Sequence, residues 1–383
     1  MTKETKGGWR SLADLQPSQP FLRNVFFLEG FDFSSNIYLV KGDYLTLVDP
    51  ANDYTAFIEL FAGDFTPAAV KKVVLTHGHV DHAMGVVELL QSYPGVGGDG
   101  GLELIMHEQG PVELREMVRE LGGRVTEVAG GEVLDLGGFA LRVLPTPGHT
   151  ADGICLYHEE SGTLFSGDTV LPRAISAPDP AAGGDLKSYL ASLRLVMEHD
   201  PGVILPGHDD PVPRNGRRVA AETYEGIVKR MMGPKVPWEA AARQFLQWGS
   251  IEDALYCCDR WLEQNADDRR ILELKGMCLN DLGRFGEAVD LFDHLPGSPG
   301  VPALAGRAYA LMGLGRHDEA LAALDRALAS DPGREEVLVY KGLALYLAGR
   351  YDEAMDIAPF QAAFADGVKR EVLLRVRGGD AAG

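Results

Sequence analysis

The chain has 383 residues, of which 45% are hydrophobic, 24% charged and 8% aromatic, so it is long enough for two or three folded domains and unlike a disordered or fibrous chain. Its formal net charge of −20 would repel phosphate backbones and anionic lipid headgroups, which argues against nucleic acid or a membrane surface as a partner. Four irregularly spaced cysteines do not form a disulfide framework, and the sequence contains no signal-peptide core and no apolar run that could span a bilayer. We therefore expect a cytoplasmic, unanchored protein.

Up to about residue 232, short apolar runs rich in β-branched residues alternate with longer stretches of helical periodicity. We predict strands at residues 24–28, 36–40, 44–48, 70–75, 102–106, 124–128, 140–144, 154–157, 163–165 and 203–205. We predict helices at residues 54–62, 83–92, 110–121, 186–198 and 217–232. Such a mixture is typical of sheets that are covered by helices.

A domain boundary is indicated at residues 231–237. This short stretch contains the chain breakers Gly233, Pro234 and Pro237, and strand-like runs disappear beyond it. We therefore predict a first domain over residues 1–232 and a second, helical domain over residues 238–376.

The second domain carries an internal repeat. Its markers are glycines placed five residues before alanines, and these alanines follow one another at spacings of 34, 32 and 34 residues: Gly249 and Ala254, Gly283 and Ala288, Gly315 and Ala320, and Gly349 and Ala354. Small residues at fixed positions let the two helices of a hairpin approach closely, and each hairpin then stacks on the next. The pattern resembles the tetratricopeptide repeat over residues 238–358, with a capping helix predicted at residues 361–376. A generic helical bundle with chance spacing is the alternative.

A dense group of metal-binding residue types follows the predicted strand at residues 70–75. His77, His79, Asp81 and His82 lie within six residues, where the chain would leave a buried strand and enter a helix. Imidazole nitrogen and carboxylate oxygen are the ligands that zinc-type cations take. His77 and His79 can face one ion while Asp81 and His82 face a point displaced from it, so the segment predicts ligands for two adjacent metals. A chance cluster in a polar loop is the alternative.

Three further predicted strands end in the same residue types. His149, Asp168 and His208 each follow such a strand, and each is directly preceded by a glycine. A glycine is expected where the backbone turns sharply to present a side chain. Packing alone does not demand this pattern at four separate strand ends, so we predict that they build one metal centre.

In this order along the chain, the motifs resemble those of the metallo-β-lactamase-fold hydrolase superfamily. The runs TPGHT at residues 146–150 and FSGDT at residues 165–169 are similar to those of its glyoxalase II type of thioester hydrolase. The resemblance covers residues 24–232 and implies an α+β fold class, in which an αββα sandwich carries the metals at one edge and is followed by the all-α repeat domain.

The resemblance also implies a binuclear centre that binds two zinc ions, or iron or manganese in their place. Its ligands would be His77, His79 and His149 for one ion, Asp81, His82 and His208 for the other, and Asp168 as a bridge between them. Asp49, at the end of an earlier predicted strand, would brace the histidine loop from behind. A hydroxide held between the ions would attack an electrophilic carbonyl, and Asp81 would be the catalytic residue that orients it and moves its proton.

We therefore expect a metal-dependent hydrolase of a small-molecule thioester or ester. The glutathione-binding helical domain of glyoxalase II is not visible, because residues 238–376 are repeat-like and acidic. The same ligands would also suit an iron-dependent persulfide dioxygenase of this fold. A hypothesis of a different class is an interaction protein, whose repeats bind a protein partner or a second copy while the metal domain is vestigial. The presence of all seven candidate ligands favours the enzyme.

Overall fold

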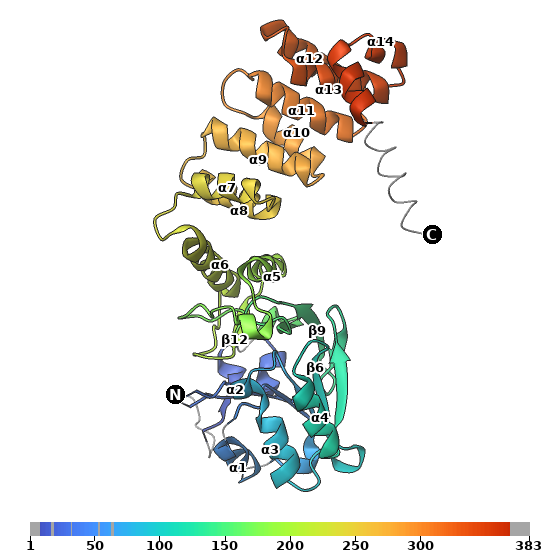
Figure 1. The fold of residues 1–383 in the computed structure, drawn as a ribbon. Helices are drawn as coiled ribbons and strands as arrows, with labels where there is room; N and C mark the ends of the chain where they lie inside the picture. Colours follow the sequence, from blue (N-terminus) through green and yellow to red (C-terminus); the bar gives the residue numbers. More distant parts are fainter. Residues whose placement is uncertain (1–7, 17–18, 32, 53, 63–64, 368–383) are drawn as a thin grey trace, which may run out of the picture. The chain divides into compact units, whose positions relative to one another are not determined.

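The computed structural model of the chain describes residues 8–16, 19–31, 33–52, 54–62 and 65–367 (Figure 1). Its contacts separate two compact units, which divide between Met231 and Met232. The first unit contains two sheets and their helices, and the described residues of the second form helices and their connections. The α+β fold class expected from the sequence is therefore confirmed.

Among the described residues, the first sheet has seven strands, which lie side by side in chain order. They are β1 (Arg10–Ser11), β2 (Val25–Leu28), β3 (Ile37–Lys41), β4 (Leu45–Val48), β5 (Val70–Val74), β6 (Glu103–His107) and β7 (Arg124–Val128). Strands β1 to β4 pair antiparallel, whereas β4 to β7 pair parallel. Because β4 and β5 run in the same direction, their carboxyl ends meet at one edge of the sheet.

The second sheet has five strands within the same part of the chain, in the order β12-β11-β10-β9-β8. They are β8 (Val133–Asp135), β9 (Ala140–Pro145), β10 (Ile154–His158), β11 (Thr163–Gly167) and β12 (Val203–Pro206). Only β11 and β12 of this sheet pair parallel in the described structure. All the predicted strands are present, whereas β1 and β8 were not predicted, because β1 spans two residues and β8 is a short, largely exposed edge strand.

The two sheets pack face to face over a shared hydrophobic core. Phe27 and Tyr38 reach it from the first sheet, and Leu156, Phe165 and Leu205 reach it from the second. The rings of Tyr38 and Phe165 meet edge to face across the interface, with their centroids 5.4 Å apart. This contact between sheets is the ββ layer of the expected sandwich.

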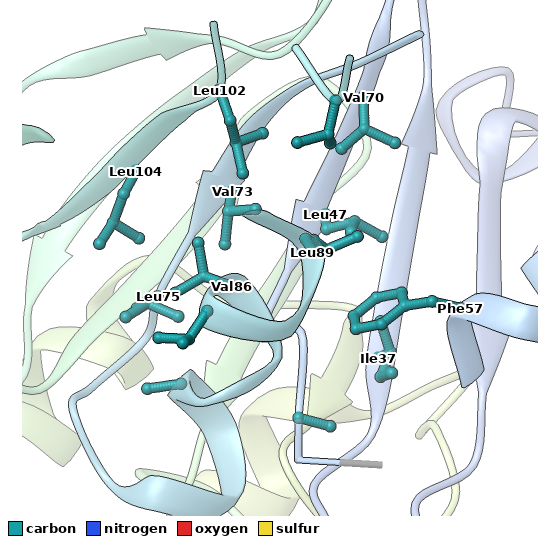
Figure 2. Close-up of a cluster of buried hydrophobic side chains, with 14 of the residues drawn as sticks. Ile37, Leu47, Phe57, Val70, Val73, Leu75, Val86, Leu89, Leu102 and Leu104 are labelled. Atoms are coloured by element: carbon teal, nitrogen blue, oxygen red, sulfur yellow. The ribbon is translucent and has the colours of Figure 1, made fainter. Parts of the chain in front are cut away.

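Helices cover the outer face of the first sheet. They are α1 (Tyr54–Ala62), α3 (Gly85–Ser92) and α4 (Val112–Glu120). Figure 2 shows Phe57 of α1 with Val86 and Leu89 of α3 against Leu47 and Val73 of the sheet, and all five side chains are fully buried. On the second sheet, α5 (Leu186–Glu198) lies against β9, and α6 (Gly216–Met232) follows β12. The unit is therefore an αββα sandwich.

The helix predicted at residues 83–92 is divided in the structure, which corrects that prediction. A short helix α2 (Val80–Ala83) precedes α3, and Met84 lies between them. The cause is a close approach of the turn after β4: the Gly85 N–H donates to the carbonyl oxygen of Ala51 at 2.6 Å, and a Cβ at Gly85 would lie 2.1 Å from the carbonyl oxygen of Pro50. This contact couples the start of the helix to the Asp49 turn.

The second unit is a stack of helical hairpins. Its helices are α7 (Trp238–Gln247), α8 (Ile251–Leu262), α9 (Arg269–Asp281), α10 (Phe285–Asp293), α11 (Val301–Gly313), α12 (His317–Ser330), α13 (Glu335–Leu347) and α14 (Tyr351–Met355). Consecutive helices pack in pairs, and α9, α11 and α13, each the first helix of its hairpin, also contact one another in sequence (Figure 1).

The repeated glycines and alanines explain this stack. Gly249, Gly283, Gly315 and Gly349 follow the first helix of each hairpin with φ values of 74°, 70°, 73° and 77°, the left-handed conformation that ends a helix. The alanines five residues later are all fully buried. A Cβ at Gly276 would lie 2.4 Å from Phe292 Cζ, so this small residue lets α9 and α10 approach.

A further helical stretch covers residues 358–367, so it begins three residues before the predicted capping helix. Pro359 is compatible with this start because proline is tolerated in the first helical turn. The remainder of the predicted helix, residues 368–376, lies outside the described residues. None of the described helices combines the length and the hydrophobicity needed to cross a bilayer.

Candidate metal centre

The seven side chains proposed as metal ligands come together at one edge of the sandwich. They leave the first sheet through the segment after β5 and the second sheet at the ends of β9, β11 and β12. Their nitrogen and oxygen atoms form three groups, each with all atoms within 4.8 Å of one another: His77, His79 and His149; Asp81, His82 and His208; and His77, His82 and Asp168.

Two glycines create the space for these side chains. Gly167 has a φ of 47°, and a Cβ there would lie 2.3 Å from Thr76 Oγ1. At Gly207, a Cβ would lie 2.4 Å from Asp168 Oδ1 and 2.5 Å from His82 Cε1. Glycine at these strand ends thus lets β11 and β12 close against the histidine segment.

Asp49 contacts the histidine segment from behind. Its buried carboxylate accepts the Thr76 N–H and O–H, both at 2.7 Å, and lies 2.9 Å from His82 Nδ1. Because the Thr76 hydroxyl donates to Asp49, its oxygen is left to accept from His77 Nδ1 at 3.2 Å. Both histidines therefore carry their proton on Nδ1 and turn a lone pair on Nε2 toward the centre.

The first histidine group is also fixed on its outer side. His79 Nε2 lies 3.1 Å from Asp179 Oδ2, and His149 Nδ1 lies 2.6 Å from the carbonyl oxygen of Ala177. Toward the centre, His79 Nδ1 lies 3.0 Å from His77 Nε2 and 3.1 Å from His149 Nε2. With the ring protons on the outer nitrogens, three lone pairs converge, and a cation between them would convert their repulsion into coordination.

Asp168 lies between the two histidine groups. Its Oδ1 is 3.4 Å from His82 Nε2 and 3.7 Å from His208 Nε2, while its Oδ2 is 3.7 Å from His149 Nε2. His82 Nε2 and Asp168 Oδ1 are buried without a hydrogen-bond partner among the described residues. Buried polar atoms are normally satisfied, so these two atoms fit metal ligands.

The charges at the centre also fit cations. Burial lowers the pKa of His77 well below its usual value. Burial acts in the same direction on His82, but the carboxylates of Asp49 and Asp168 outweigh it and raise the pKa of His82. Burial would raise the pKa of Asp168, yet the electrostatic effect of the surrounding imidazoles, that of His82 above all, holds it far below its usual value. The ionised carboxylates therefore favour positive charge at this point.

Sequence reasoning missed several residues that hold the candidate ligands in place. Asn36 donates to the carbonyl oxygens of Pro206 and Asp209, at 2.9 and 2.7 Å, and so fixes the turn that carries His208. Tyr189 donates to the backbone carbonyl of Asp168 at 3.0 Å. Neither residue belongs to a local motif. For Asp179, the one available signal was its place before a proline, which is typical of a helix N-cap.

Two family models match the chain. The model described as the metallo-β-lactamase superfamily matches residues 30–208, which include all seven candidate ligands. The model described as the tetratricopeptide repeat matches residues 306–365, within the stack of hairpins.

The curated relatives include two proteins named thioesterases and one named a probable metallo-hydrolase. The chain is 33% identical over 182 residues to the thioesterase pkgB of Emericella nidulans, with 46% of each chain covered. It is 28% identical over 200 residues to the atrochrysone carboxyl ACP thioesterase AgnL7 of Paecilomyces divaricatus, covering 51% of this chain and 56% of the relative. It is 30% identical over 217 residues to the probable metallo-hydrolase YqjP of Bacillus subtilis, covering 46% of this chain and 67% of the relative. The chain thus spans about half the length of the two thioesterases.

Proposed function

The chain belongs to the metallo-β-lactamase superfamily, and from this premise we propose that it is a binuclear hydrolase that cleaves a small-molecule thioester or ester. The observation that carries the proposal is the convergence of seven candidate ligand side chains from both sheets, with Asp168 lying 3.4 Å from His82 of one group and 3.7 Å from His149 of the other. Two relatives are named thioesterases, which favours a thioester as the substrate.

In the proposed enzyme, two divalent cations, zinc or alternatively iron or manganese, would polarise the carbonyl and lower the pKa of the attacking water. His77, His79 and His149 would hold one ion and Asp81, His82 and His208 the other, with Asp168 between them. Asp49 and Thr76 would keep the ring protons of His77 and His82 on Nδ1 and so leave Nε2 of each ring free to hold an ion.

Asp81 is the proposed catalytic residue. Its Oδ2 lies 3.2 Å from His208 Nε2, and its side chain remains 29% exposed, so the carboxylate can meet both an ion and a water molecule. Burial would raise the pKa of Asp81, but the hydrogen bond from His208 and the charge of His82 outweigh it and hold this pKa below its usual value. The ionised carboxylate can orient the attacking water and accept its proton.

A substrate panel tests the enzyme. The full chain would be loaded with zinc, iron or manganese and assayed with acyl-coenzyme A, acyl-glutathione and phenyl ester substrates. Asp81→Asn should lower kcat by about 10²–10⁴-fold, whereas the exposed control Asp99→Asn should behave as the parent chain. Tight binding of two ions without turnover of any substrate would contradict the proposal. Oxygen uptake with glutathione persulfide by the iron form would instead identify a persulfide dioxygenase.

The repeat unit is proposed to dock an extended segment of a partner protein. A cavity of about 470 Å³ lies along the first helices of three hairpins, α9, α11 and α13. In its lining, Asn280 is 93% buried: its Nδ2 donates to the Gly306 carbonyl at 2.8 Å, but its Oδ1 has no partner within the described structure. Such an acceptor favours a ligand that brings an N–H donor, as a peptide backbone does.

The rim of this cavity favours a basic residue next to an apolar one. The Asp281 carboxylate is exposed and forms no ion pair within the described part of the chain, while Met277 and Tyr309 are exposed large side chains beside it. Displayed peptides selected on the full chain should therefore pair Lys or Arg with an apolar residue. Asn280→Ala should weaken their binding at least about tenfold, whereas the exposed Asn265→Ala should not. A concentration-dependent dimer without such peptides would favour self-association.

A further inference from the structure

A short segment after β11 contacts three of the candidate ligands. The Ser176 hydroxyl donates to Asp168 Oδ2 at 3.4 Å, the Ala177 carbonyl accepts from His149 Nδ1 at 2.6 Å, and the Asp179 carboxylate lies 3.1 Å from His79 Nε2. We call residues 176–179 the strap. Among these three contacts of the strap, the one between Asp179 and His79 places a negative charge beside a candidate histidine ligand.

The backbone around Asp179 holds its carboxylate in place. Asp179 Oδ1 accepts the Ala181 N–H at 2.9 Å, at the start of the 3₁₀ helix Pro180–Ala182. The Asp179 N–H donates to the His149 carbonyl and its own carbonyl accepts from Gly184, both at 2.7 Å. One carboxylate oxygen is thereby committed to the helix cap, and the other is left to face His79.

From this geometry we propose that Asp179 is a positioning residue that keeps the ring proton of His79 on Nε2 and so presents Nδ1 to a metal ion. His79 differs from its two neighbours, because His77 and His149 turn Nε2 toward the same point. A carboxylate behind a histidine ligand fixes the ring, selects the tautomer and makes the inner nitrogen a stronger donor. This inference rests on the proposed function, since it requires a metal in the first histidine group.

The two halves of the centre would then depend on different carboxylates. Asp49 is buried, lies behind His82 and reaches His77 through Thr76. Asp179 contacts His79 alone among the ligand side chains of the described structure, and its side chain is 38% exposed. Loss of Asp179 should therefore lower the affinity for one ion and leave the affinity for the other almost unchanged.

Metal titration of the full chain tests this inference. With a chromophoric chelator as competitor, the parent chain should bind two zinc ions. Asp179→Ala should weaken one of them by about 10–100-fold. Asp179→Asn should lower the affinity for the same ion at least as much. Its amide N–H would donate to His79 Nε2 and so force the ring proton of His79 onto Nδ1.

Melting of the metal-free chain separates positioning from a structural role. Asp179→Asn can keep the cap on Ala181, whereas Asp179→Ala cannot. The melting temperature should therefore fall less in Asp179→Asn than in Asp179→Ala. If Asp179 had a structural role alone, metal affinity would follow the melting temperatures, and Asp179→Asn would bind metal nearly as well as the parent chain. That result would overturn the inference.

A second variant controls for loss of a cap in the same connection. Asp185 caps α5 by accepting the Ser188 N–H at 2.9 Å and contacts no candidate ligand in the described structure. Asp185→Ala should lower the melting temperature yet bind two ions with the affinity of the parent chain, and an equal loss of metal affinity in Asp185→Ala would contradict the inference.

An unchanged metal titration of both Asp179 variants would refute the inference while leaving the proposed hydrolysis intact. A parent chain that binds two ions but hydrolyses no substrate would refute only the proposed function, and one that binds none would overturn both.

Discussion

Substitution of Gly207 by alanine tests whether the centre needs the space that this glycine leaves. Gly207 follows β12 and precedes His208, and its φ lies outside the left-handed region. Alanine can therefore adopt this backbone without strain, so any effect comes from the added methyl group. That methyl would lie 2.4 Å from Asp168 Oδ1 and 2.5 Å from His82 Cε1.

The size of the effect follows from these distances. An ordinary contact of a Cβ atom begins at 3.4 Å, so the Asp168 oxygen and the new methyl must separate by about 1 Å. A displacement of about 1 Å at a catalytic centre costs about 100-fold in rate. Overpacking a well-packed site costs about 1–3 kcal/mol, which lowers the melting temperature of a unit of this size by about 2–12 °C.

The assay compares Gly207→Ala with a matched variant at the other end of the same strand. A Cβ at Gly202 would meet only the Gly162 carbonyl oxygen, at an ordinary distance of 3.9 Å. We expect Gly207→Ala to bind less than two equivalents of zinc and to lose about 100-fold in kcat/KM, and Gly202→Ala to match the parent chain in both. Full metal content and full activity in Gly207→Ala would refute the geometry of the centre.

Three further perturbations have defined outcomes. Removal of the ions by a chelator should destabilise the first unit by about 2.7 kcal/mol at a free metal concentration 100 times the Kd, measured by calorimetry. Asp49→Asn keeps a residue type that tolerates the φ of 50° at this turn but cannot replace both carboxylate oxygens, so metal affinity by calorimetric titration should fall about 10–100-fold. Burial lowers the pKa of His158 below 6.5, so acid protonates the unfolded state first and destabilises the fold. His158→Gln should therefore reduce the fall in melting temperature between about pH 8 and pH 5.

Each of these outcomes has a contrary result. A melting temperature that ignores the chelator would mean that the ions add nothing to the fold. Parent-like titration of Asp49→Asn would remove its role behind the histidines. An unchanged pH profile in His158→Gln would place the acid-sensitive group elsewhere, for example at the buried His77, whose pKa is also lowered.

The sequence could predict those parts of the site that depend on local pattern. β-branched runs indicated the strands, and a polar residue after a glycine at a strand end indicated His149, Asp168 and His208. Each signal lies within a few residues of the side chain concerned. The glycines of the repeat were equally local, because each ends a helix by adopting a left-handed conformation.

The parts that escaped prediction depend on contacts between distant segments. Asn36 and the Pro206 carbonyl it binds are 170 residues apart in sequence, and His79 and Asp179 are 100 apart. The break between α2 and α3 likewise comes from the approach of Gly85 to the Pro50 turn. Pattern in a single chain carries no signal for such pairs, because either partner alone is an ordinary polar or small residue.

The candidate ligands come from both sheets of the sandwich, with the segment after β5 on one side and the ends of β9, β11 and β12 on the other. An ion bound there would link the two sheets, because separating them would also break its coordination. Amide exchange in the core between the sheets should therefore slow when metal is added and quicken when it is withdrawn. A substitution of a ligand that changes the preferred metal must then also change the stability of the packing between the two sheets. Substitutions in loops that contact only the substrate do not have this effect.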